Sequence, residues 1–306
     1  ARRVQRYQLA IPHGLRRSGR GGDRGASTVE VPFEDGRTFY ASIAPITGDA
    51  DVTVGVVVVM RDVTHFKELD EMKSEFVSTV SHDLRAPLTY MRGYTNMLTM
   101  MGNLNERQHD YVRRILEGIE QMNALIGDLL DLRRVQDGVG IRREPCRLGM
   151  VLVEAVDSMR AKAKSKGVTL QLEPAHGAPT VIGDRTLLRE VVSNLVDNAI
   201  KYTPSGGSVR VGLDVNEREA TIRVTDTGIG IAPADQVRLF EKFHRIKRRE
   251  TAGIKGTGLG LALVKSIIDR HDGRVRVEST LNEGSTFFVE LPIPTERALE
   301  ALETQA

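Results

Sequence analysis

The apolar residues between positions 65 and 135 recur at helical spacing in two successive stripes. At about 100° per residue, the first stripe fills an arc roughly 120° wide. Its positions are Phe76, Val77, Val80, Leu84, Leu88 and Met91. The second stripe contains Tyr111, Ile115, Ile119, Met122, Leu125, Leu129 and Leu132. Turn residues separate the stripes at Gly102–Asn105, which predicts two helices, from about His65 to Met101 and from about Glu106 to Val135.

The first 64 residues have strand composition instead. The predicted strands are Thr28–Phe33, Arg37–Ile46 and Thr53–Arg61. Asp35-Gly36 is a hairpin turn between the first two strands, and residues 48–51 form the next turn. Either Asp62 or Thr64 is expected to cap the helix that follows.

The region 142–293 mixes helical and strand patterns. A helix at Leu148–Lys166 stops at Gly167, and a stronger helix begins after Asp184, its expected N-cap. A shorter helix is expected at Leu261–Arg270. The predicted strands are Val168–Leu172, Thr180–Ile182, Ala220–Thr225, Arg274–Ser279 and Ser285–Leu291.

One histidine lies opposite the first apolar stripe. His82 is about 180° from the centre of that arc, so its imidazole is expected to face water. The neighbouring Asp83 can hold one ring nitrogen as N–H, which leaves the other lone pair free for nucleophilic attack. Pro87 lacks a backbone donor and crowds the carbonyl of Asp83, which predicts a kink or loosened turn. From these residues alone, a solvated surface histidine and a nucleophile both stay open.

Polar residues interrupt the apolar face of the helix after Asp184. Asn198 falls inside the arc that should be buried, while Asn194 and Lys201 lie at its edge. A buried amide needs hydrogen-bond partners. Core hydrogen bonding and a metal–phosphate site are equally compatible with this placement.

Two glycine-rich segments favour the phosphate alternative. Asp226 continues the buried face of its strand by period two and can accept a hydrogen bond from an exocyclic amine such as that of adenine. Gly228 and Gly230 allow a close approach of the backbone. The run Gly256–Gly260 precedes a helix, whose free N–H groups and positive dipole favour phosphate.

Together these motifs resemble those of bacterial sensor histidine kinases. Ser-His-Asp-Leu-Arg-Ala-Pro-Leu at 81–88 is similar to the family's phosphoacceptor box. The nucleotide boxes are matched at Asn194–Tyr202, Asp226–Gly230, Leu239–Phe243 and Gly256–Gly260, with the closing signature Gly284-Ser285-x-Phe287. The resemblance implies that His82 accepts the phosphoryl group and that Asp83 is the acidic general base. Ala86 stands where the family usually carries Thr or Asn, so phosphatase activity is not implied.

The resemblance also implies roles in binding ATP and Mg²⁺. Asn198 would coordinate Mg²⁺, Asn194 and Lys201 would face the phosphates, Tyr202 would lie by the base, and Asp226 would read the adenine amine. The other expected nucleotide-binding residues are Gly228, Gly230, Gly256, Thr257, Gly258, Leu259 and Gly260. In the basic segment that follows the box at Leu239–Phe243, Arg245 is expected to be the phosphate contact.

We therefore expect a multidomain fold. Residues 1–64 resemble the C-terminal part of an α+β PAS-like sensor domain. Residues 65–141 form a dimerisation and histidine phosphotransfer domain, whose helical hairpin needs a second chain to complete a four-helix bundle. Residues 142–293 form an α/β sandwich that binds ATP, and residues 294–306 are a tail.

Composition and charge indicate which partners and which cellular compartment to expect. The net charge of +2 gives no reason to expect nucleic acid as the main partner. The single Cys146 excludes an internal disulfide and fits a reducing compartment. No stretch approaches 18 apolar residues, so no membrane segment is expected here. The expected location is the cytoplasm, either for the whole protein or as the cytoplasmic part of a longer, membrane-associated sensor.

The predicted function is Mg-ATP-dependent autophosphorylation of His82 in a homodimer, followed by transfer to an aspartate on the receiver domain of a response regulator. One alternative is an ATP-driven conformational machine with the same nucleotide fold. The helical hairpin that carries the His-Asp pair argues against it. A second alternative is a non-enzymatic dimeric scaffold with a vestigial nucleotide site, but every nucleotide box is intact.

Overall fold

The computed structural model describes residues 27–33, 36–47, 53–138, 140–174, 179–246, 254 and 256–294. Within these ranges it describes the backbone alone at residues 27, 28, 45, 47, 53, 68–78, 82 and 101. The chain forms two compact units, one up to Val77 and one from Ser78 onward.

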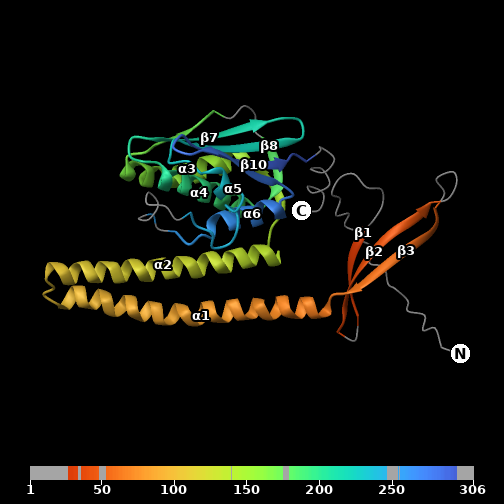
Figure 1. Cartoon of the computed structure of the whole chain (residues 1–306), viewed down its shortest axis with the longest axis horizontal. Coiled ribbons are helices and arrows are strands. Elements are labelled where there is room, and N and C mark those ends of the chain that lie inside the picture. The colour runs from red at the N-terminus through yellow and green to blue at the C-terminus, as the bar shows by residue number, and fades with distance from the viewer. Residues whose placement is uncertain are drawn as a thin grey trace. The chain divides into compact units, whose positions relative to one another are not determined.

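The first unit contains a three-stranded antiparallel sheet in the order β1-β2-β3 (Figure 1). Its strands are β1 (Ser27–Pro32), β2 (Thr38–Thr47) and β3 (Thr53–Asp62), each within one residue of its predicted bounds. Gly36 has a φ of +83°, as the predicted hairpin turn requires. Asp35 and the turn at 48–51 lie outside the described residues.

Asp62 starts the long helix as expected. Its Oδ1 accepts hydrogen bonds from the Thr64 backbone N–H at 2.9 Å and from the Thr64 hydroxyl at 2.6 Å. The helix, α1 (Thr64–Met101), runs without interruption through Pro87. The missing backbone donor at Pro87 therefore does not divide the helix.

A second helix, α2 (Glu106–Asp137), returns beside α1 (Figure 1). Asn105 and Gln108 form a reciprocal capping box at its start. Gly138, with a φ of +70°, ends the helix two residues later than predicted.

The hairpin buries only part of its apolar stripes. Leu88, Ile119 and Ile126 form a small buried cluster. Seven other stripe residues are exposed in the single chain, namely Val80, Leu84, Met91, Tyr111, Ile115, Met122 and Leu125. Much of the apolar surface that the pattern predicts to be buried is therefore left exposed by this hairpin alone.

The C-terminal region is a two-layer α/β fold (Figure 1). Its five-stranded sheet has the order β5-β7-β8-β10-β9, in which only the β5–β7 pair is parallel. The strands are β5 (Thr169–Leu172), β7 (Ser208–Val215), β8 (Glu219–Asp226), β9 (Arg274–Thr280) and β10 (Gly284–Pro292). Helices α3 (Leu148–Lys166), α4 (Arg185–Tyr202) and α6 (Gly260–Arg270) cover one face.

Three elements were not predicted. They are β7, the short strand β4 (Glu144–Arg147) that pairs with β6 (Thr180–Gly183), and α5 (Pro233–Gln236). The predicted N-cap of α4 is confirmed, because Asp184 accepts from the backbone N–H groups of Thr186 and Leu187. None of the helices in the described ranges is both long enough and apolar enough to cross a bilayer.

The main hydrophobic core lies between the sheet and its helices. Every second residue of β8 is buried, and Val191, Val192, Leu195 and Val196 of α4 are fully covered. Leu132 and Val135 near the end of α2 join the same core. The C-terminal half of α2 is therefore packed against the α/β fold.

Candidate functional site

A cavity of about 640 Å³ lies between α4, the end of β8, the glycine-rich loops and α2. Most of the predicted nucleotide-binding residues line it, although they come from four separate segments. They are Asn194, Asn198, Lys201, Tyr202, Asp226, Gly230, Arg245, Gly256, Thr257, Gly258 and Gly260.

Two predicted residues lie behind the lining. The Gly228 N–H donates to Asp226 Oδ1 at 2.8 Å, and the Leu259 side chain is fully buried in the core. A Cβ at Gly228 would lie 2.6 Å from that same carboxylate oxygen. Both residues shape the cavity rather than face it.

The predicted phosphoacceptor pair comes from a different helix, α1. His82 and Asp83 are on α1, and no α1 residue is among the described residues that line the cavity. Asp83 is exposed, whereas the His82 side chain lies outside what the structure describes. Asp83 is not among the described residues that line the cavity.

Asp226 is the buried carboxylate of the cavity. It ends β8 with 6% of its surface exposed, as the alternation along the strand predicts. Burial raises the pKa of Asp226 to about 6, although hydrogen bonds from the Gly228 and Ser285 backbone oppose the rise. Most of the carboxyl is therefore ionised at pH 7 and can accept a hydrogen bond from an amine.

Helix α4 presents two asparagines to the cavity. The Asn194 side-chain amide donates to the Glu190 carbonyl at 3.1 Å, which orients its Oδ1 away from the helix backbone. A Cβ at Gly260 would lie 2.9 Å from that Oδ1, so the glycine makes room for the amide. The Asn198 side chain has no hydrogen-bond partner among the described residues, which favours a cavity-facing role over core hydrogen bonding.

The glycine loops differ in their need for glycine. Gly230 has a φ of +62°, and a Cβ there would lie 1.9 Å from the Thr280 carbonyl oxygen. Gly258 has a φ of +76° and packs on the Phe243 backbone. A Cβ at Gly256 would meet nothing within 4 Å, so its surroundings are open.

Arg245 and Tyr202 complete the predicted lining. The Arg245 guanidinium donates to the Ile254 carbonyl at 2.7 Å, which ties its side chain to the loop that carries the second glycine motif. Burial raises the pKa of the Tyr202 hydroxyl, although the charge of Arg245 opposes the rise. Tyr202 is therefore neutral at pH 7.

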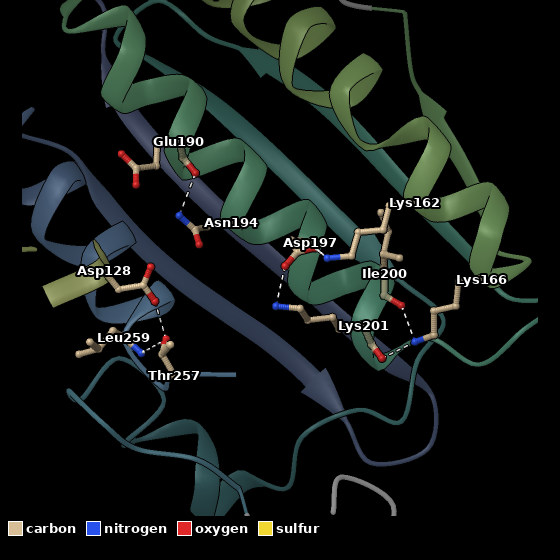
Figure 2. A network of polar contacts seen from close by, with 10 residues as sticks. All are labelled: Asp128, Lys162, Lys166, Glu190, Asn194, Asp197, Ile200, Lys201, Thr257 and Leu259. Carbon is tan, nitrogen blue, oxygen red and sulfur yellow. Dashed lines mark hydrogen bonds and ion pairs between the residues drawn. The ribbon is translucent and has the colours of Figure 1, made fainter. Parts of the chain in front are cut away.

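Helix α2 forms one wall of the cavity, which the sequence did not indicate. Its lining residues are Glu117, Glu120, Gln121, Ala124 and Asp128. The Thr257 hydroxyl donates to Asp128 Oδ2 at 2.5 Å, and the Leu259 N–H donates to the Thr257 oxygen at 3.3 Å (Figure 2). The three- and four-residue spacing of these α2 positions marks one polar face, but a polar face usually indicates solvent.

Two further lining residues, Asp197 and Lys162, were missed. Asp197 of α4 lies between the ammonium groups of Lys201 and Lys162, with a distance of 2.6 Å to the Lys201 Nζ (Figure 2). Burial alone would raise the pKa of Asp197, but hydrogen bonds and charge from the two lysines hold it below the ordinary value. The i, i+4 spacing of Asp197 and Lys201 was a usable signal, whereas Lys162 comes from α3 and belongs to no motif.

The donor set fits a Mg–nucleotide complex. Mg²⁺ is usually held by one or two protein oxygens together with phosphates and water. The Asn198 amide oxygen can supply one such ligand. No cluster of three or more His, Cys, Asp or Glu ligands occurs in the part of the chain that the structure describes.

Comparison with protein families agrees with this geometry. Residues 183–295 match the model described as histidine kinase-, DNA gyrase B- and HSP90-like ATPase. Residues 72–138 match the model of the His Kinase A (phospho-acceptor) domain. The chain belongs to the sensor histidine kinase family. The predicted multidomain architecture of a small N-terminal sheet, a helical hairpin and an α/β ATPase domain is confirmed.

Individual histidine kinases resemble this chain over most of its length. It is 33% identical over 243 residues to the sensor protein SrrB of Staphylococcus aureus, a match that covers 78% of this chain and 41% of SrrB. This chain therefore matches less than half the length of that relative. A crystal structure of full-length ShkA in complex with AMPPNP is 28% identical, with a TM-score of 0.59, and covers 72% of this chain and 46% of ShkA. The fold also matches that of ThkA, crystallised with the response regulator TrrA, with a TM-score of 0.54 at 21% identity, over 88% of this chain and 79% of ThkA.

Proposed function

We propose that this histidine kinase uses Mg-ATP to phosphorylate His82 and then passes the phosphoryl group to an aspartate on a response-regulator receiver domain. The observation that carries the proposal is the cavity, in which four separate motifs meet around one buried carboxylate. The two matched domains support the same conclusion, because one is named for an ATPase and the other for a phosphoacceptor.

In this proposal, different residues of the cavity bind the adenine, the phosphates and the metal ion of Mg-ATP. The ionised Asp226 accepts a hydrogen bond from the adenine amine, and Tyr202 lies beside the base. Asn194, Lys201 and Arg245 face the phosphates, and Asn198 supplies an oxygen to Mg²⁺. Bound Mg²⁺ neutralises phosphate charge during phosphoryl transfer. The glycine loop that ends at Gly260 opens α6 and can offer backbone N–H groups to phosphate oxygens.

His82 and Asp83 provide the acceptor. A neutral imidazole attacks through the lone pair of its unprotonated nitrogen. Asp83 directly follows His82 in the sequence. Its carboxylate can hold the other ring nitrogen as N–H, which selects the reactive tautomer. Phosphoryl transfer requires mainly positioning and charge neutralisation, which this set of residues can supply.

A movement of the cavity relative to the hairpin is also part of the proposal. Its lining contains α2 residues and no described α1 residue. We propose that the ATPase domain moves relative to α2, so that the cavity reaches His82 on the same chain or on a second chain. The loop at Gly102–Asn105 joins the two helices of this phosphoacceptor hairpin.

A homodimer is part of the proposal. The exposed stripe residues of α1 and α2 need a cover, and a second hairpin would complete a four-helix bundle around them. We further propose the domain bounds 1–64 (PAS-like), 65–141 (dimerisation and phosphotransfer), 142–293 (ATP-binding) and 294–306 (tail). An ATP donor favours a cytoplasmic location. Phosphatase activity is not included, because Ala86 has no hydroxyl or amide.

The test is incubation of the chain with γ-labelled ATP and magnesium. We expect a label on the protein that is stable in alkali and labile in acid. His82→Gln should abolish the label while leaving ATP binding unchanged. His65→Gln removes an exposed histidine from the same helix and should keep the label. Sustained ATP hydrolysis without any protein label would reject the kinase assignment in favour of an ATP-driven conformational machine.

A further inference from the structure

A lysine-rich corner borders the cavity where α3 passes α4. We define the lysine corner as Lys162 and Lys166 of α3 together with Asp197 and Lys201 of α4 (Figure 2). Lys162, Asp197 and Lys201 line the cavity. Lys166 donates to the carbonyl of Ile200 at 2.8 Å and also to the Lys201 carbonyl, so it holds the last turn of α4.

The charges of the lysine corner do not balance. The corner contains three ammonium groups and one carboxylate, a net charge of +2, and only Lys162 and Lys201 pair with that carboxylate. Among the described residues, Lys162 and Lys201 form ion pairs with Asp197 alone. Burial and the nearby charge of Lys162 lower the pKa of Lys166, as expected where positive charges are crowded. An additional anion at this corner would relieve that repulsion.

The geometry leaves hydrogen-bond donors for such an anion. Each ammonium group carries three N–H donors. Lys162 and Lys201 each direct one donor to a different oxygen of Asp197. The remaining donors of both groups lie at the edge of the cavity, within reach of a ligand that enters it. A phosphate oxygen accepts strongly from ammonium donors.

We propose that Lys162 is a further nucleotide-binding residue, which holds the phosphate groups of ATP together with Lys201, and that Asp197 is the positioning residue for both lysines. The inference rests on the proposed function, because it concerns the same ATP site. It extends the site beyond the recognised motifs, since Lys162 lies on α3, 32 residues before Asn194.

The competing description is an ordinary surface ion pair between α3 and α4. The Lys162 side chain is 49% exposed, and exposed pairs contribute little to stability. If the pair is only structural, substituting Lys162 should lower the free energy of unfolding slightly and should not change the affinities for different nucleotides to different extents. If Lys162 contacts phosphate, its substitution should instead weaken nucleotide binding by an amount that depends on the number of phosphate groups in the ligand.

The experiment measures the affinities of ATP, ADP, AMP and adenosine for the whole chain by calorimetry at low and high salt. Lys162→Ala should weaken ATP binding roughly five- to twentyfold at low salt and leave adenosine binding unchanged. The loss should shrink at high salt, because the contact is electrostatic and partly exposed. Lys162→Arg should recover part of the affinity.

Two comparisons isolate the proposed roles. Lys164→Ala removes an exposed charge from the same helix, away from the cavity lining, and should leave the affinity for ATP unchanged. In an Asp197→Asn background, Lys162→Ala should have a smaller effect than in the wild-type chain, because Lys162 has already lost its anchor.

Equal affinities for ATP in Lys162→Ala and Lys164→Ala would overturn the nucleotide role while leaving the proposed kinase function intact. An equal loss for adenosine and ATP would also overturn it. An unchanged effect of Lys162→Ala in the Asp197→Asn background would overturn the positioning role. A wild-type chain that binds no ATP would reject both this inference and the proposed function.

Discussion

Glu190 provides the sharpest test of the electrostatics between α2 and α4. The residue lies one helical turn before Asn194 (Figure 2), and its side chain is only partly buried. Burial, followed by the negative charges of Asp131 and Asp128 on α2, raises the pKa of Glu190 to about 7. We therefore choose the substitution Glu190→Gln, which removes the charge and keeps the size of the side chain.

The direction of the pH effect follows from linkage. The folded pKa of Glu190, about 7, lies above its ordinary value of 4.5. Between these two values the folded state binds a proton that the unfolded state has lost, so the protein becomes less stable as the pH rises through 7. Above pH 7 the ionised carboxylate remains beside the two aspartates, and the penalty is complete.

The size of the penalty is bounded by the same shift. A rise from 4.5 to about 7 corresponds to at most about 3.4 kcal/mol at 1.36 kcal/mol per pH unit. The carboxyl group is only partly buried, and solvent screens its interactions. A contribution of about 1–2 kcal/mol is therefore expected. The glutamine amide carries no charge and avoids this penalty at every pH.

The assay is urea unfolding of both proteins at pH 5 and pH 8, followed by far-ultraviolet circular dichroism. Glu190→Gln should be about 1–2 kcal/mol more stable than wild type at pH 8, and the two proteins should differ little at pH 5. Asn194 bonds to the backbone carbonyl of residue 190, so the substitution leaves that contact in place. Glu217→Gln removes the same charge from an exposed loop and should not alter the pH dependence.

Two results would refute this reasoning. One is a Glu190→Gln variant that is no more stable than wild type at pH 8. The other is a gain of equal size at pH 5 and pH 8, which would show that the variant acts through packing rather than charge.

Three further outcomes follow from the packing. Gly230→Ala should lose most nucleotide affinity in a fluorescent-ATP titration, because its Cβ would lie 1.9 Å from the Thr280 carbonyl oxygen. Gly256→Ala is the control, since its Cβ would meet nothing within 4 Å and the variant should stay folded. Leu88→Ala opens the small core of the hairpin and should cost about 2–4 kcal/mol in thermal unfolding; an unchanged melting temperature would contradict the burial of Leu88. Asp184→Ala removes the acceptor for two N–H groups of α4 and should cost about 1 kcal/mol in urea unfolding, with Asp184→Asn nearly unchanged as the control.

Features that depend on neighbours in the sequence were predictable. The capping aspartates at 62 and 184 and the stop at Gly167 all function locally, within one helical turn. The burial of Asp226 follows from alternation along its own strand. A strong local preference decides such features whatever the rest of the chain does.

Features that depend on contact between distant segments were not predictable. Strand β4 has four residues with no pattern of its own and exists because it pairs with β6. The acidic face of α2 reads as a solvated surface, yet Asp128 accepts a hydrogen bond from Thr257, 129 residues away. Lys162 likewise lines the cavity only because α3 packs beside α4.

The amino-acid order by itself determined the long helices, most strands and the motifs that surround the cavity, because period, capping and glycine freedom are local properties. Only the tertiary structure decided which polar side chains outside those motifs share the site. Helix α2 forms one wall of the cavity and α3 adds a lysine to it, since packing of the apolar faces gathers the polar side chains that flank those faces around one cavity. No single segment contains that information.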